Sequence, residues 1–180
     1  MRADATRNLE TVLSTGARML AADPATSVSA IAAEAGVDRR TVYRRFAGRE
    51  ELLAAIYVAR LEAIERVMAG ARFTESPVPV ALHRYVEGII GVNRTWPVDL
   101  TRMLVDPAIR ERRERSVQAL DAFLRRAADE GYLRPELPLN WISRVMQQML
   151  HLAPAELSGR TDAEAADILV DTLLHGAGTR

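Results

Sequence analysis

Apolar residues recur every three or four positions along the whole chain, which is the period of an amphipathic helix and not of a strand. Runs of alternating β-branched residues are missing, and alanine and leucine dominate. Proline, glycine and capping residues interrupt the pattern and divide it into helical segments. These fall at about 6–22, 27–35, 39–46, 49–69, 79–93, 98–105, 107–130, 139–151 and 162–175. The pattern therefore predicts an all-α fold of nine helices without a sheet.

The ends of several helices can be read from single residues. Ser27 and Asp38 stand directly before helical segments, where a side-chain oxygen can accept a hydrogen bond from a free backbone N–H. Gly36 follows the second segment, where a residue able to adopt positive φ can close a helix. Thr161–Glu164 has the sequence of a capping box at the start of the last helix. Pro154 is expected to end or kink the eighth segment.

Composition indicates a globular chain and removes several kinds of chemistry. Of the 180 residues, 48% are hydrophobic and 27% are charged, which suffices for a buried core. The N-terminal residues lack the apolar stretch of a secretion signal, so we expect a cytoplasmic protein. Cysteine is absent, which excludes disulfides, thiolate metal sites and cysteine nucleophiles.

The charges cancel in sum but are unevenly distributed. The chain has 24 basic and 24 acidic residues, and every basic residue is arginine. Residues 39–49 contain five arginines and no acid, whereas residues 121–180 contain six arginines and nine acids. For nucleic-acid binding the distribution of charge matters more than its sum, so residues 39–49 are a candidate DNA contact.

Residues 27–46 have the pattern of a helix-turn-helix, two short helices joined by a tight turn around Gly36. The second helix exposes arginines whose guanidinium groups can bind guanine through two hydrogen bonds, and Thr41 offers a hydroxyl and a methyl group. Hydroxyls and N–H groups at the start of the first helix can take a phosphate. The ordinary alternative is a solvated helix face, which the absence of acids disfavours.

The segment Ser27–Phe46 and its continuation Gly48–Leu53 resemble the DNA-binding region of the tetracycline-repressor-like (TetR) regulators. The resemblance covers about fifty residues, and the nine-helix layout agrees over the rest of the chain. It implies a helix-turn-helix domain at 1–47 and a regulatory and dimerisation domain at 48–180, with a linking helix at 48–70. It also implies a homodimer that represses transcription from a palindromic DNA operator and responds to a small molecule.

Positions in the TetR pattern suggest roles for individual residues. The implied base contacts are Arg39, Arg40, Thr41, Tyr43 and Arg44. The implied phosphate contacts are Ser27, Ser29, Tyr43, Arg45 and Arg49. Two residues depart from the pattern: Arg40 stands where many members have a small residue, and Arg49 replaces the commoner lysine. Because Arg40 could change which bases are read, the operator sequence cannot be inferred from those of relatives.

The resemblance places a ligand pocket and a dimer interface in the C-terminal helices. Apolar residues that could line the pocket are Tyr85, Ile89, Trp96, Met103, Phe123, Met146 and Met149, and polar groups could come from His83, Arg102 and Gln147. Ordinary core packing is the alternative for all of the apolar ones. Helices apolar on more than one side suggest a partner helix pair. Candidate interface residues are Trp141, Val145, Ile168, Leu169, Thr172 and Leu173.

Other classes of function find less support in the sequence. No nucleophile elbow or glycine-rich phosphate loop occurs, so we expect no enzyme and no cofactor. His83 and Glu87 share a helix face and could ligate a metal, but a salt bridge or exposure is the better interpretation, and we predict no metal site. The remaining alternative is a helical interaction protein with a degenerate DNA-binding domain. That protein would have no reason to keep an arginine face free of acids.

Overall fold

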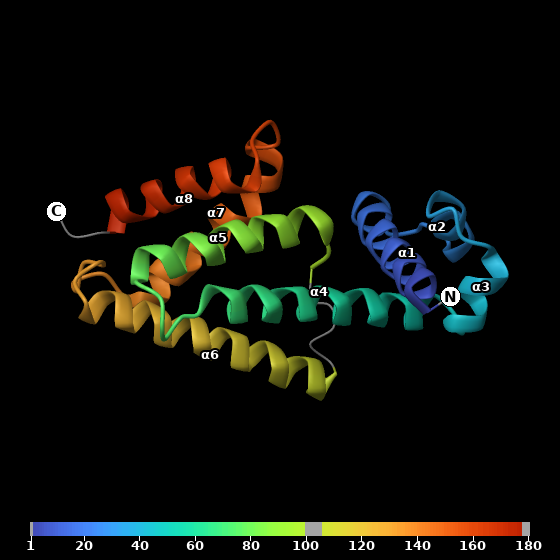
Figure 1. Ribbon diagram of the computed structural model, residues 1–180, viewed down its shortest axis with the longest axis horizontal. Coiled ribbons are helices and arrows are strands. Elements are labelled where there is room, and N and C mark those ends of the chain that lie inside the picture. Colours follow the sequence, from blue (N-terminus) through green and yellow to red (C-terminus); the bar gives the residue numbers. More distant parts are fainter. Residues whose placement is uncertain (1, 100–105, 178–180) are drawn as a thin grey trace. The chain divides into compact units, whose positions relative to one another are not determined.

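The computed structural model describes residues 2–99 and 106–177, and these form eight helices (Figure 1). The helices are α1 (Arg2–Ala22), α2 (Val28–Glu34), α3 (Arg39–Arg45), α4 (Arg49–Ala71), α5 (Val78–Thr95), α6 (Pro107–Asp129), α7 (Leu139–Glu156) and α8 (Asp162–Ala177). The predicted all-α architecture is confirmed. The count of nine is one more than the described residues contain, because residues 98 and 99 are not helical and the rest of the helix expected at 98–105 lies outside them. Within the described ranges, no helix combines the length and the apolar character needed to span a membrane.

The predicted helix ends are confirmed by their hydrogen bonds. Ser27 Oγ accepts from the N–H of Ala30 at 3.1 Å, and Asp38 Oδ1 accepts from the N–H of Arg40 at 2.7 Å. Gly36 has φ +65°. Its N–H donates to the carbonyl of Ala33, and this bond ends α2 as expected for a glycine that follows a helix.

The chain packs into two compact units. The first contains Met1–Glu62 and Thr95–Ile109, of which residues 1 and 100–105 are not described. Its buried residues include Ile31, Leu52 and Ile56. The second contains Ala63–Arg94 and Arg110–Arg180, of which residues 178–180 are not described. Its core joins α5, α6, α7 and α8 around Phe123, whose ring stacks on that of Phe73 with centroids 4.4 Å apart.

Pro154, which the sequence predicts to end or kink its helix, does not end it, because α7 continues to Glu156. A proline has no N–H, so the carbonyl of Leu150 loses its partner within the helix. The side-chain amide of Asn93, from α5, donates a hydrogen bond to that carbonyl at 2.8 Å. A buried carbonyl without a partner would be costly, and Asn93 removes this cost. The helix therefore tolerates the proline because a residue on another helix compensates for it.

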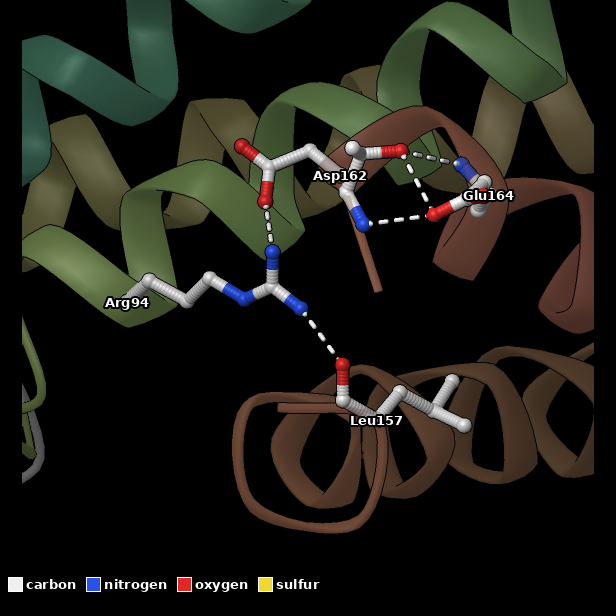
Figure 2. A network of polar contacts seen from close by, with 5 residues as sticks. Arg94, Leu157, Asp162 and Glu164 are labelled. Atoms are coloured by element: carbon white, nitrogen blue, oxygen red, sulfur yellow. Dashed lines mark hydrogen bonds and ion pairs between the residues drawn. The ribbon is translucent and has the colours of Figure 1, made fainter. Parts of the chain in front are cut away.

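Residues at the end of α5 hold the turn between α7 and α8 (Figure 2). Arg94 forms an ion pair with Asp162 Oδ1 at 2.5 Å and donates to the carbonyl of Leu157 at 2.9 Å. Asp162 is the first residue of α8, and Leu157 follows the last residue of α7. The capping box is confirmed beside them, since Glu164 accepts from the N–H of Thr161 at 2.9 Å. One guanidinium thus joins the end of α7 to the start of α8.

Close packing between α4 and α5 depends on Gly88. A Cβ atom at this position would lie 2.6 Å from Cγ1 of Val67 and 3.2 Å from its Cβ. Because the Cβ of Val67 is fixed by its backbone, rotation of the valine side chain cannot relieve the contact. The two helices would have to separate.

We expect Gly88→Ala to lower the free energy of unfolding. Forcing a methyl group into a packed site costs about 1–3 kcal/mol, and the better helix propensity of alanine returns at most about 1 kcal/mol. Gly70→Ala is the matched control, because a Cβ there meets nothing within 4 Å. The control should be neutral or stabilising. Urea unfolding followed by circular dichroism measures both, and equal effects at the two sites would contradict the steric explanation.

Candidate nucleic-acid interface

The helix-turn-helix is built from α2, which packs on α1, and α3, which packs on α2 and is mostly exposed. Val42 is the buried residue of this helix, and Phe46 follows it into the same core. Three of the seven residues are buried in α2: Val28, Ile31 and Ala32. The one buried position of α3 therefore attaches the helix to the core, and the other six side chains are exposed.

The structure brings the predicted base-contacting side chains to one exposed surface. All six polar or aromatic residues of α3 are exposed: Arg39, Arg40, Thr41, Tyr43, Arg44 and Arg45. The helix carries no acidic side chain, and the carboxylate of Asp38, which caps its start, accepts a hydrogen bond from the backbone N–H of Arg40. The result is a short cationic helix with several guanidinium forks pointing away from the core. Such forks match the acceptor pair of guanine in the major groove.

Tyr43 belongs to this surface and not to the core. Its side chain is 39% exposed, and the guanidinium of Arg39 lies over its ring at 5.1 Å from the centroid. A cation over an aromatic face is held there by the charge distribution of the ring. This contact favours a position of the Arg39 guanidinium over the Tyr43 ring. The phenol itself stays available for a phosphate or a base.

The residues predicted to contact phosphate differ in exposure and in their hydrogen-bond partners. Ser27 is exposed, and its hydroxyl accepts from Ala30 while keeping a proton to donate. Ser29 is half-buried in the first turn of α2. Arg45 is exposed at the end of α3. Arg49 is different, because its guanidinium donates to the backbone carbonyls of Pro24 and Thr26. The residues around Arg49 in the sequence do not predict these hydrogen bonds.

The residues predicted to line a pocket fall in different places. Tyr85, Ile89, Phe123 and Met146 are buried together in the core of the second unit, and Met149 packs against that core. Trp96 is buried in the first unit. Met103 and Arg102 lie outside the described residues.

Of the polar residues predicted beside the pocket, His83 lies close to two carboxylates and Gln147 is exposed. His83 Nε2 lies 2.9 Å from Asp167 Oδ1, and Nδ1 lies 3.8 Å from Glu87 Oε2. Gln147 is exposed on α7, where its amide lies 3.4 Å from the hydroxyl of Ser143. Among the residues that the structure describes, no group of three or more metal-ligating side chains gathers in one place.

The predicted interface residues divide into an outer and an inner set. Trp141 and Ile168 are 59% and 40% exposed, Thr172 is exposed, and Val145 is half-buried. Leu169 and Leu173 are instead buried in the chain's own core. Leu152, which shares the helical side of Trp141 and Val145, is 53% exposed and belongs with the outer set. Exposure thus separates the two apolar sides of these helices, which periodicity alone could not do.

Tyr85 gives the second unit a measurable dependence on alkaline pH. Burial raises the pKa of Tyr85 to about 12. In the unfolded chain a tyrosine ionises near pH 10, so between about pH 10 and 12 the unfolded state releases a proton that the folded state keeps. Stability from this group is fully present below pH 10 and is lost as pH rises towards 12. The full loss is on the order of 3 kcal/mol.

We expect Tyr85→Phe to flatten this loss of stability. The chain contains no lysine or cysteine, so few other side chains titrate in the same range. Urea unfolding at pH 9, 10 and 11 measures the slope. The same substitution at exposed Tyr132 keeps Tyr85 and therefore keeps the slope. Identical slopes in the two variants would rule out Tyr85 as the source.

Comparison with known proteins agrees with this geometry. A family model described as "Bacterial regulatory proteins, tetR family" matches residues 13–56, which contain α2, α3 and the start of α4. The chain is 31% identical to the HTH-type transcriptional repressor LfrR of Mycolicibacterium smegmatis, over 94% of this chain and 90% of that protein.

Solved structures extend the agreement to the whole fold. The crystal structure of LfrR from Mycobacterium smegmatis in complex with proflavine superposes with a TM-score of 0.73, at 26% identity over 100% of both chains. The ketosteroid transcriptional regulator KstR2 of Mycobacterium tuberculosis superposes with a TM-score of 0.77 over 94% of both chains. At 18% identity, this second likeness concerns the fold alone.

An all-helical fold that presents a cationic helix-turn-helix defines a DNA-binding transcriptional regulator. The chain belongs to the tetR family of bacterial regulatory proteins. This family consists of regulators and not of enzymes, and the interpretation as an interaction protein with a degenerate DNA-binding domain is not favoured.

Proposed function

We propose that this regulator is a repressor that binds a palindromic operator as a homodimer and is released by a small molecule. The observation that carries the proposal is the exposed face of α3, with four arginines and no acid. Repression is supported by the similarity to LfrR, whose name describes a transcriptional repressor. Two copies of α3, about one helical turn of DNA apart (~34–36 Å), would read the two halves of a palindrome.

The contacts to DNA divide into two kinds in this proposal. Base edges are read by Arg39, Arg40, Thr41, Tyr43 and Arg44, whereas phosphates are bound by Ser27, Ser29 and Arg45, with the Tyr43 hydroxyl as a further donor. The first kind confers sequence preference, and the second confers affinity that falls with salt.

The ligand would bind in the second unit, among the apolar side chains around Tyr85 and Phe123. LfrR was crystallised with proflavine, so proflavine is the first probe to try on this chain. A ligand changes operator affinity only by its differential affinity for the DNA-bound and DNA-free conformations. Proflavine that binds the protein without weakening its DNA complex would therefore not qualify as an effector.

The test is fluorescence anisotropy with a duplex taken from beside the chain's own gene, against a scrambled duplex, at two salt concentrations. Tight binding to the first duplex with much weaker binding to the second is the expected result. Weak binding that is equal on both duplexes and lost with salt would leave only a nonspecific cationic surface at this location. Other intergenic duplexes would then be screened, and uniform failure would contradict the proposal.

A further inference from the structure

Arg49 connects two parts of the first unit that are far apart in sequence. It is the first residue of α4, and its two terminal nitrogens donate to the carbonyls of Thr26 and Pro24. These carbonyls belong to the loop between α1 and α2. A planar guanidinium can serve two acceptors at once, whereas the ammonium of a lysine is a single point of charge. The structure thus uses the feature that distinguishes arginine from the lysine common at this position.

The loop that Arg49 holds is itself ordered and leads directly into α2. Asp23 Oδ1 accepts from the N–H of Ala25 at 2.8 Å, and the hydroxyl of Thr26 donates to the carbonyl of Asp23 at 2.8 Å. The next residue, Ser27, caps α2. A displacement of the carbonyls at 24 and 26 would therefore reach the first turn of α2, and α2 packs on α3.

The start of α4 does not need Arg49 for its own stability. Glu51 Oε2 accepts from the N–H of Ala47 at 2.6 Å, and the N–H of Leu52 donates to the carbonyl of Gly48 at 3.2 Å. These bonds satisfy backbone groups at the start of the helix. A substitution at 49 should therefore leave α4 intact and loosen only its connection to the loop.

We propose that Arg49 is a positioning residue and not a phosphate anchor. It fastens the loop between α1 and α2 to the first turn of α4, and so sets where α2 and the recognition helix α3 stand relative to α4. The consequence for DNA rests on the proposed function, whereas the consequence for the loop does not. A phosphate anchor would act through its charge, and a positioning residue acts through its two-point geometry.

The variants Arg49→Lys and Arg49→Gln separate the two roles. Lysine keeps the charge and loses the two-point contact, so both variants should weaken operator binding by about tenfold. The slope of log K against log salt should be unchanged in both, because no phosphate contact is lost. Arg45→Gln is the comparison, and its slope should fall by about 0.9. Wild-type affinity for Arg49→Lys together with a reduced slope for Arg49→Gln would overturn the proposal.

Amide hydrogen exchange without DNA tests the same inference independently. In both Arg49 variants the backbone amides of residues 25–31 should exchange at least about tenfold faster, since the loop is no longer fastened. Arg45→Gln should leave those rates unchanged, and thermal unfolding should show that all variants remain folded. Unchanged exchange in both Arg49 variants would overturn the proposal even if DNA binding were lost. Faster exchange in a chain that binds no DNA selectively would support the positioning role and reject the proposed function.

Discussion

Replacing Trp141 and Ile168 together by aspartate is expected to yield a folded monomer that no longer binds its operator tightly. Trp141 on α7 and Ile168 on α8 are exposed, whereas the other sides of these two helices are buried. Exposed large apolar side chains are typical of a surface that a partner covers. In a symmetric dimer the same surface is used twice, so the double substitution would bring four carboxylates together. Losing the second half-site should weaken DNA binding by about 10²–10⁴-fold.

Sedimentation velocity measures the mass, and anisotropy measures the affinity. Val80→Asp with Val117→Asp is the matched control, because both valines are exposed on helices of the same unit but outside α7 and α8. The control should remain a dimer. Leu169 and Leu173 are avoided, since a charge in the chain's own core would unfold it. A dimer that persists in the first variant and dissociates in the control would place the interface elsewhere.

Arg44→Ala is expected to remove much of the preference for the operator over a scrambled duplex. A guanidinium that binds guanine through two hydrogen bonds contributes about 1–3 kcal/mol of discrimination, which corresponds to roughly 5- to 150-fold. The side chain is exposed on α3 and has no part in the core that Val42 and Phe46 form. The substitution should therefore leave stability unchanged and act on recognition alone.

Two further arginine variants show whether the loss at Arg44 concerns sequence or charge. Arg45→Ala should weaken binding to both duplexes equally and lower the salt slope by about 0.9, as expected for one lost phosphate contact. Arg72→Ala removes one positive charge from the second unit, where Arg72 pairs with Glu75, and should change neither affinity nor preference. Uniform weakening by both α3 variants would mean that Arg44 contacts the backbone and not a base.

The DNA-binding helices could be predicted almost to the residue because their ends are determined locally. Ser27, Gly36 and Asp38 act on backbone groups within three or four positions of themselves, and short-range rules describe such bonds well. The exposed face of α3 could be predicted for the same reason. Val42 is the one aliphatic residue of this seven-residue helix, and its burial determines which side of the helix faces the core.

The features that the sequence did not reveal depend on residues far away along the chain. Pro154 is accommodated by Asn93, and Arg49 is engaged by a loop more than twenty residues before it. An arginine at the start of a helix has the same local pattern whether it meets a phosphate or a carbonyl. Periodicity likewise shows that α8 has two apolar sides, one with Leu169 and one with Ile168. It does not show that the side with Leu169 faces the chain's own core.

The double contact of Arg94 has a consequence for how the chain can change in evolution. The carbonyl of Leu157 and the carboxylate of Asp162 are held by one guanidinium, so the distance between the end of α7 and the start of α8 does not depend on the turn that joins them. The turn can therefore lengthen by insertion at residues 158–160, before the capping Thr161, while both helices keep their places. Related chains should vary in length at this turn and keep an arginine opposite it, and the turn is a suitable site for inserting an epitope or a fluorescent reporter.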